Sequence, residues 1–159
     1  MTHATDVSLE IPLPDEAATL ALGARLARGL VPGLRVWLSG DLGAGKTTLT
    51  RGLLRGLHYA GRVKSPTYNL VEIYEFSSFN LYHFDLYRFV DPIEWEEAGF
   101  RDCFNAQSVC LVEWPEKGQG VLPEPDVHVW LAIDDEARFA RLTGLTEAGR
   151  QCVKWLASA

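Results

Sequence analysis

The amino-acid sequence contains no apolar run that approaches the ~20 residues of a membrane-spanning helix. Its first residues, MTHATDVSLEIPLPDEA, also lack the basic segment and the apolar stretch of an export signal. These two absences lead us to expect neither a membrane protein nor an exported one. The expected location is the cytoplasm.

Cysteine is scarce, and the pattern of the three cysteines gives no sign of a metal or redox site. Cys103, Cys110 and Cys152 are odd in number and far apart, and no C-x-x-C pair occurs. Zinc sites and disulfide frameworks are built from closely spaced or paired cysteines. We expect these three to be reduced side chains that pack in the interior.

An excess of positive charge is also missing. Fifteen Lys and Arg residues stand against twenty-one Asp and Glu residues, which gives a formal net charge of -6. A protein that binds nucleic acid over a large surface needs cations to neutralise phosphates. Any contact with nucleic acid is therefore expected to be indirect or local.

Length and composition are those of one ordinary globular domain. At roughly 150 residues per domain, a chain of 159 residues with 47% hydrophobic and 23% charged side chains has little room for a second domain. No repeat or low-complexity linker interrupts it, and the segment 118–125 is interpreted as a loop. We expect residues 1–159 to form a single domain.

Hydrophobic periodicity predicts interleaved helices and strands. A first helix is expected after Pro14, with Asp15 as its cap and its end near Pro32 and Gly33. The tetrapeptide SSFN between two alternating segments suits a hairpin of antiparallel strands. This order is typical of a three-layer α/β domain with a mixed, mainly parallel sheet that includes an antiparallel hairpin. The expected strands are 36–38, 70–76, 81–87, 109–112 and 127–133, and the later helices begin near residue 46 and span 147–156.

The segment GDLGAGKT matches the phosphate-binding pattern G-x-x-x-x-G-K-[ST] and lies between a predicted strand and a predicted helix. The glycines let backbone N–H groups approach phosphate oxygens, and the helix adds its positive end. A glycine-rich turn that matches by chance is the alternative, but the flanking elements favour a P-loop NTPase fold. Lys46 is expected to reach the β- and γ-phosphates and the Thr47 hydroxyl to bind Mg²⁺. The predicted nucleotide-binding residues here are Gly40, Gly43, Ala44, Gly45, Lys46, Thr47 and Thr48.

Two carboxylates are candidates for the chemistry. Glu113 ends an apolar strand, where P-loop folds place an acid beside the metal, although a solvated strand-end Glu is the alternative. In the segment HFDLYR, Asp85 is a candidate to orient the attacking water, accept its proton or hold a metal-bound water. His83 lies on the same strand face, either as a catalytic group or as a hydrogen-bonded structural residue. Arg88 is either a phosphate-facing cation or the partner of Asp91 or Glu94 in a surface ion pair.

Two further segments leave alternatives open. The segment from Ser65 to Tyr68 follows the P-loop helix, where Ser65 or Thr67 is positioned to sense the γ-phosphate, unless the segment is simply a turn. Trp95 stands among Glu94, Glu96 and Glu97, which indicates either a solvated helix face or an aromatic anchor for a partner.

Known P-loop classes narrow the choice of nucleotide and reaction. The N-K-x-D and D-x-x-G motifs of GTPases are absent, which favours ATP over GTP. Small-molecule kinases of this size need an arginine-rich lid, and Arg138 and Arg141 are the one late arginine pair in the sequence. A small-molecule kinase therefore stays open as an alternative.

Four motifs in this order and spacing, GDLGAGKTT, KSPTYNLVE, YHFDLYR and LVEWPEKGQGVLP, closely resemble the TsaE family of bacterial P-loop ATPases. The resemblance covers nearly the whole chain and is most specific between Trp37 and Pro123. It implies a cytoplasmic ATPase that hydrolyses ATP slowly alone and acts with the proteins TsaB and TsaD. Those partners attach a threonylcarbamoyl group to adenosine 37 of tRNAs, so contact with tRNA is expected to be indirect.

The resemblance also implies roles for individual residues. It assigns Mg²⁺ binding to Thr47 and Glu113, and it places Asp85 near the γ-phosphate with a role in hydrolysis. The segment from Ser65 to Tyr68, including Thr67, corresponds to a switch region. The adenine is expected between the start of the first helix, at Asp15 to Thr19, and Arg138. The implied catalytic residues are Lys46, Asp85 and Glu113.

The leading hypothesis is an ATPase that resets a multiprotein tRNA-modifying complex. A nucleotide-dependent binding module, in which ATP only orders a loop for docking, is the alternative from another class. The two differ in whether complex turnover needs Asp85.

Overall fold

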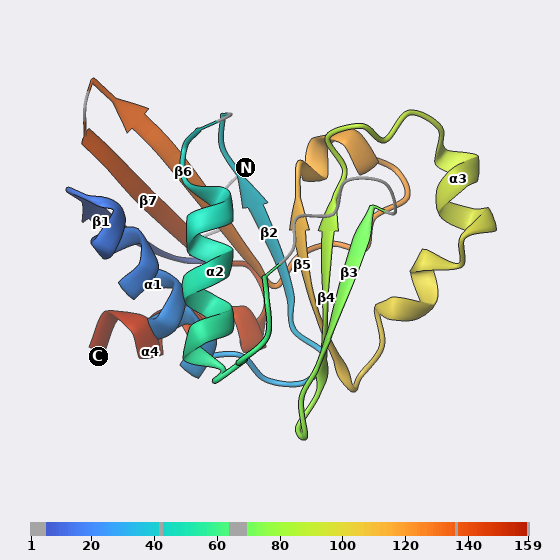
Figure 1. Ribbon diagram of the computed structural model, residues 1–159, viewed down its shortest axis with the longest axis horizontal. Coiled ribbons are helices and arrows are strands. Elements are labelled where there is room, and N and C mark those ends of the chain that lie inside the picture. Colours follow the sequence, from blue (N-terminus) through green and yellow to red (C-terminus); the bar gives the residue numbers. More distant parts are fainter. Residues whose placement is uncertain (1–5, 42, 64–69, 136, 159) are drawn as a thin grey trace.

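The computed structural model describes residues 6–158 except 42, 64–69 and 136. They form a seven-stranded sheet in the order β1-β7-β6-β2-β5-β4-β3, with helices on both faces (Figure 1). The four central strands run parallel, and antiparallel strands flank them on both sides. No helix among the described residues is long and apolar enough to cross a membrane. The strands are β1 (Val7–Leu13), β2 (Arg35–Ser39), β3 (Val71–Glu75), β4 (Asn80–Asp85), β5 (Ser108–Glu113), β6 (Val127–Asp134) and β7 (Ala137–Gly144); the helices are α1 (Glu16–Arg28), α2 (Lys46–Gly56), α3 (Pro92–Glu97), the 3₁₀ turns η1 (Phe100–Cys103) and η2 (Pro115–Gly118), and α4 (Glu147–Ser158).

Two apolar cores lie on the two faces of the sheet, as the mixed three-layer prediction requires. Along β5, Leu111 faces the core shared with α1 and α2, whereas Val112 faces the core beneath α3. A central parallel strand is covered on both faces, which explains why its sequence is almost continuously apolar. Trp95 of α3 is 2% exposed and packs 5.5 Å, centroid to centroid, from Phe84. The predicted solvated helix face is confirmed, because Glu94, Glu96 and Glu97 are exposed. The alternative, in which Trp95 anchors a partner, is wrong, because its side chain belongs to the second core.

The first helix begins as predicted but ends earlier. The carboxylate of Asp15 accepts a hydrogen bond from the N–H of Ala18 at 2.8 Å, which confirms the predicted cap. The helix stops at Arg28, four residues before the predicted end near Pro32. The N–H of Gly29 bonds to the carbonyl of Leu26 at 3.0 Å and closes the last turn. The apolar stripe continues past this point, so periodicity alone extended the helix too far.

The predicted hairpin is confirmed, but two strands were missed. β3 and β4 pair antiparallel across the SSFN connection. β1 and β7 pair antiparallel with each other, and β7 also pairs antiparallel with β6, so these strands complete the other edge. Pro12 argues against a strand in the interior of a sheet, but β1 is an edge strand, where the missing N–H costs no ladder bond.

Helices α1 and α2 touch at backbone distance, and glycine makes this possible. A Cβ atom on Gly52 would lie 2.2 Å from the carbonyl oxygen of Leu20, and one on Gly23 would lie 2.2 Å from that of Leu49. Both glycines are in helical segments, where alanine is ordinarily preferred. Close approach therefore sets the position of α2 and, with it, the position of the P-loop.

We expect Gly52→Ala to lower the free energy of unfolding by ~1–3 kcal/mol, because overpacking forces the helices apart. Urea unfolding monitored by circular dichroism measures this change. Ala21→Ser, on the exposed side of α1, adds one atom without a clash and is expected to stay within ~0.5 kcal/mol of the wild type. An unchanged or higher urea midpoint for Gly52→Ala would contradict the close contact.

Candidate functional site

The P-loop segment joins β2 to α2, as predicted. Gly40 has a φ of 150°, and a Cβ atom there would lie 2.5 Å from the carbonyl oxygen of Leu131. Gly45 has a φ of 112° and precedes α2, whose start has no side-chain cap. Glycine tolerates both conformations. The first N–H groups of α2 are thus not bonded by a capping side chain, which is the arrangement that accepts a phosphate group.

Lys46, the first residue of α2, is 7% exposed and holds its ammonium group against the loop. Nζ donates to the carbonyl oxygens of Gly40 and, at 3.3 Å, Asp41, and lies 4.1 Å from the centroid of the Trp114 ring. Burial lowers the pKa of Lys46 below its ordinary value of 10.5, although the carboxylate of Glu113 opposes the shift. A phosphate bound in the loop would compete with these partners for the ammonium group.

The two predicted carboxylates lie side by side. β4 and β5 are parallel neighbours, and their register pairs Asp85 with Glu113 at the carboxyl ends of both strands. His83 is two residues earlier on the same face of β4. Its Nε2 lies 2.6 Å from Oε2 of Glu113, and the residues are 3% and 5% exposed. Of the two interpretations of Glu113, the solvated strand end is therefore wrong.

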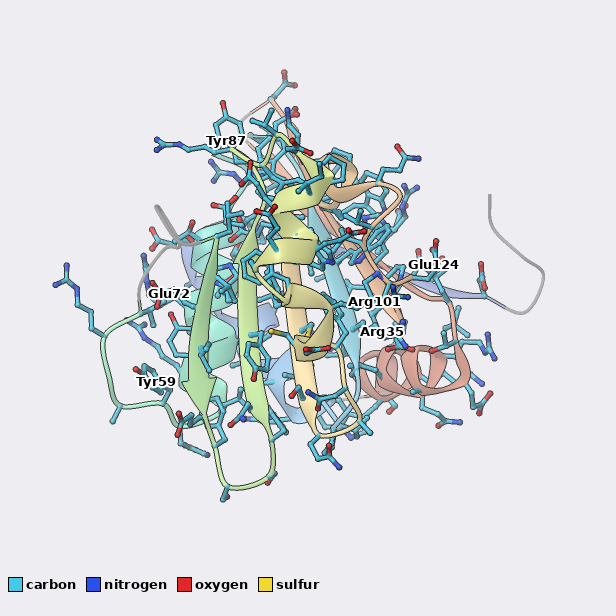
Figure 2. The ribbon with its side chains drawn as sticks, turned by 90° about the vertical axis from the view of Figure 1, so that its right-hand side faces the viewer. Arg35, Tyr59, Glu72, Tyr87, Arg101 and Glu124 are labelled. Carbon is cyan, nitrogen blue, oxygen red and sulfur yellow. The ribbon has the colours of Figure 1, made fainter. Side chains whose placement is uncertain are left out.

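Asp85 is in an environment that disfavours its charge. Burial raises the pKa of the Asp85 carboxyl above its ordinary value of 3.8, and the nearby Glu113 raises it further. The N–H of Tyr87, which donates to Oδ1 at 3.1 Å, has the opposite effect. Figure 2 shows Tyr87 at the end of the molecule toward which β4 runs. The Asp85 carboxylate is thus oriented by the backbone that immediately follows its own strand.

One cavity of about 290 Å³ gathers most of the predicted site. Gly40 and Ala44 belong to the loop but not to the cavity wall. The wall also includes two aromatic residues that the motif analysis did not select. The lining residues are Gly43, Gly45, Lys46, Thr47, Thr48, Asp85, Tyr87, Glu113 and Trp114.

The donor atoms of this cavity fit Mg²⁺. Thr47 is exposed and contributes a hydroxyl, and Glu113 contributes a carboxylate on the same wall. Mg²⁺ prefers oxygen ligands and is commonly held by one or two carboxylates together with the phosphates of a substrate. The metal-binding and catalytic roles of these side chains stay predictions.

The adenine-binding prediction concerns groups that the fold brings to the loop. Arg138 of β7 pairs in register with Leu13, just before the first helix, and its Nη2 donates to the carbonyl of Gly43 at 3.0 Å. Thr19 is also close to the loop, since a Cβ on Gly45 would be 3.5 Å from its Cγ2. The start of α1 and Arg138 therefore both border the P-loop, and Asp15 is engaged there as the cap of α1.

Other sequence predictions fall elsewhere. Ser65 and Thr67 lie outside the described residues. Arg88 is exposed and, within the described part of the chain, forms no ion pair with Asp91 or Glu94. Asp91 instead caps α3, accepting the N–H of Ile93 at 3.0 Å.

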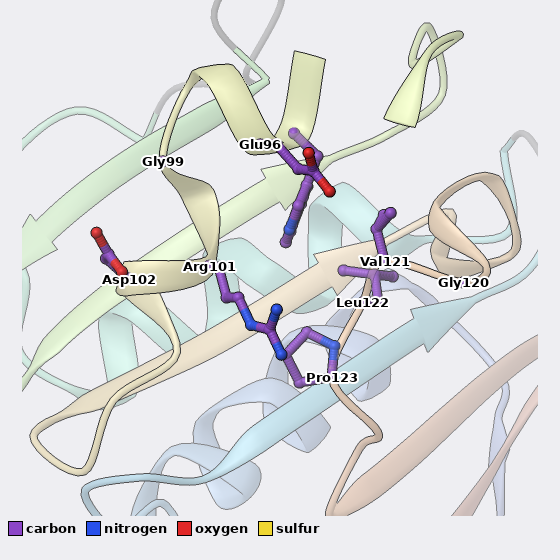
Figure 3. A pocket seen from close by; sticks show the side chains of 9 residues that line it. Glu96, Gly99, Arg101, Asp102, Gly120, Val121, Leu122 and Pro123 are labelled. Atoms are coloured by element: carbon purple, nitrogen blue, oxygen red, sulfur yellow. The ribbon is translucent and has the colours of Figure 1, made fainter. Parts of the chain in front are cut away.

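A larger cavity, about 480 Å³, lies beside α3 and contains none of the predicted site residues. Figure 3 shows Arg101, Glu96 and Leu122 around it. Cavity size alone would have directed attention to this surface. The P-loop and the paired carboxylates identify the smaller cavity as the candidate site.

Sequence reasoning missed the two aromatic walls of that cavity. Tyr87 and Trp114 pack with a centroid distance of 5.0 Å, and Trp114 also faces the Lys46 ammonium group. Trp114 has a φ of 56°, a conformation that bulky residues rarely adopt. The signal available in the sequence was its position directly after Glu113, the end of the buried strand.

Comparisons with known proteins agree with this architecture. Residues 13–142 match the family model described as threonylcarbamoyl adenosine biosynthesis protein TsaE. A Haemophilus influenzae protein named tRNA threonylcarbamoyladenosine biosynthesis protein TsaE is 49% identical over 151 residues, covering 92% of this chain and 96% of that protein. A Bacillus subtilis protein of the same name is 40% identical over 126 residues, covering 77% of each.

A solved structure gives the same result for the fold. The crystal structure of Bacillus subtilis YdiB superimposes with a TM-score of 0.78 at 27% sequence identity, covering 98% of both chains. This likeness supports the predicted P-loop NTPase fold with its mixed sheet. The matched family model spans both the P-loop and the carboxylate pair. The chain belongs to the TsaE family of threonylcarbamoyl adenosine biosynthesis proteins.

Proposed function

We propose that this protein binds ATP with Mg²⁺ in the P-loop cavity and hydrolyses it as a component of the machinery that makes threonylcarbamoyladenosine in tRNA. The observation that carries the proposal is the single cavity in which Lys46, Thr47, Asp85 and Glu113 meet. Phosphoryl transfer depends on positioning and on stabilising phosphate charge, and these are the groups it needs. Family membership supports the pathway.

Each side chain has a separate task in this proposal. Lys46 and the N–H groups at the start of α2 stabilise the charge of the phosphates. Asp85, oriented by the N–H of Tyr87, positions the attacking water and accepts its proton. Thr47 and Glu113 would hold Mg²⁺, which when bound supplies charge neutralisation at the phosphate oxygens.

The proposed partners are TsaB and TsaD, and the proposed location is the cytoplasm. A net charge of -6 gives no general attraction to tRNA phosphates, so we place the tRNA contact on the partner proteins. In this proposal, ATP hydrolysis resets the protein complex and does not act on the tRNA directly. This arrangement predicts that the partners, rather than a small metabolite, stimulate the enzyme.

The deciding experiment measures ADP release by the purified chain with ATP and Mg²⁺, alone and with stoichiometric TsaB and TsaD. We expect slow release that needs Mg²⁺ and increases with both partners. Stimulation by a phosphate-accepting metabolite instead would indicate a small-molecule kinase. Nucleotide binding without any Mg²⁺-dependent hydrolysis would leave a binding module.

A further inference from the structure

A buried hydrogen bond joins β4 to β5 directly behind the candidate phosphate site. Nε2 of His83 lies 2.6 Å from Oε2 of Glu113, and the two side chains are 3% and 7% exposed. A carboxylate oxygen accepts hydrogen bonds, so Nε2 is the donor. Bonds to a charged acceptor are shorter and stronger than neutral ones. The Glu113 carboxylate is thus held from its side facing β4.

The second ring nitrogen indicates what the histidine is for. Nδ1 of His83 is buried and has no hydrogen-bond partner among the described residues. A histidine that only ties strands together normally satisfies both nitrogens, because an unpaired buried polar atom is costly. The one hydrogen bond that His83 makes with the described side chains is with Glu113. His83 therefore makes its bond to Glu113 through Nε2 while Nδ1 has no hydrogen-bond partner among the described residues.

We propose that His83 is a positioning residue that fixes the Glu113 carboxylate for binding Mg²⁺. By occupying Oε2, it leaves Oε1, which takes no hydrogen bond from the described residues, as the oxygen available to the metal. Groups behind a metal ligand orient that ligand and tune its affinity. The inference rests on the proposed function, since it assigns a role in the same nucleotide site.

Three substitutions separate positioning from packing. His83→Leu removes the donor and keeps an apolar side chain of similar bulk. His83→Gln carries an amide N–H that can extend about as far as Nε2, whereas the amide of His83→Asn is shorter. Isothermal titration calorimetry with ADP, in Mg²⁺ and in EDTA, measures how much the metal adds to nucleotide affinity.

We expect His83→Leu and His83→Asn to lose roughly 10- to 100-fold of the Mg²⁺-dependent part of the affinity, the usual effect of removing a group behind a metal ligand. Affinity in EDTA is expected to stay within about twofold, and His83→Gln to recover most of the loss, because it restores the donor. The Mg²⁺ concentration for half-maximal hydrolysis should rise in parallel. These readouts would not move if His83 served only to fill space.

The matched control is His128→Gln. His128 is half-buried, its Nε2 pairs with the Ser39 hydroxyl at 2.8 Å, and burial lowers its pKa to about 4, but it lies on β6 with its ring stacked on Trp130. Its replacement should leave the Mg²⁺ contribution to nucleotide affinity unchanged.

Wild-type Mg²⁺ dependence in His83→Asn, or equal losses in folded His83→Gln and His83→Asn, would overturn the inference. If His83→Leu does not fold, the comparison of His83→Gln with His83→Asn decides whether His83 positions Glu113. A wild-type protein that binds no nucleotide would instead overturn the proposed function.

Discussion

Lys46→Ala is expected to lower kcat/KM for ATP hydrolysis by about 10²- to 10³-fold, the usual loss when one preorganised charge-stabilising donor is removed. Nζ is held within the loop by the carbonyls of Gly40 and Asp41 and by the ring of Trp114. These contacts keep the charge close to where phosphate would bind. The side chain is then ordered before the nucleotide arrives, and little of its freedom remains to be lost on binding.

Steady-state ADP release measures the loss in the rate of hydrolysis, and calorimetric titration with ATP measures any loss in affinity. Lys154→Ala, on the exposed side of α4, removes the same charge and is expected to change neither. Lys46→Arg is expected to resemble Lys46→Ala, because a planar guanidinium group cannot take the place of a compact ammonium group among two carbonyls and a ring. Wild-type hydrolysis by Lys46→Ala would remove the P-loop lysine from the mechanism.

The phosphate loop could be predicted from sequence because its geometry imposes a local pattern. Gly40 and Gly45 both adopt positive φ angles, and Gly40 also meets the neighbouring backbone closely, so the spacing of the glycines carries the structure. Glu113 was found by a related route, since it ends a strand at the edge where P-loop folds place their chemistry. Asp85 was selected from the segment HFDLYR, inside a strand predicted over 81–87, and the structure shows that it ends β4. Their pairing in register then follows from the parallel sheet.

What could not be predicted depends on contacts between distant segments. No local pattern shows that Trp114 turns with a φ of 56° and covers Lys46, 68 positions earlier in the sequence. The bond from His83 to Glu113 likewise needs the order of β4 and β5 in the sheet. The edge pair of β1 and β7 was missed for a different reason. Pro12 weakens the strand signal of β1, although an edge strand tolerates a proline.

Asp85→Asn is expected to reduce the rate of hydrolysis by about 10²- to 10⁴-fold, the range for losing a general base, while ATP affinity is retained. Asparagine keeps the size of the side chain and can still accept the N–H of Tyr87, but it cannot take a proton. Asp91→Asn is the matched control, because it removes an equal charge and asparagine remains a good cap for α3. Turnover of the complex with TsaB and TsaD should stop in Asp85→Asn only. Turnover that survives would favour the binding module over the ATPase.

Stability provides an independent check, because the same substitution should not weaken the fold. The folded-state pKa of Asp85 is raised above 3.8, chiefly by burial, so the folded state penalises the charged form. That penalty is present above the folded-state pKa and absent below the unfolded value near 3.8. Asparagine never carries the charge, so Tm of Asp85→Asn should equal or exceed the wild-type value at neutral pH, and the difference should vanish as the pH falls toward 3.8. A variant that is less stable at neutral pH would mean that the Asp85 carboxylate supports the fold rather than the chemistry.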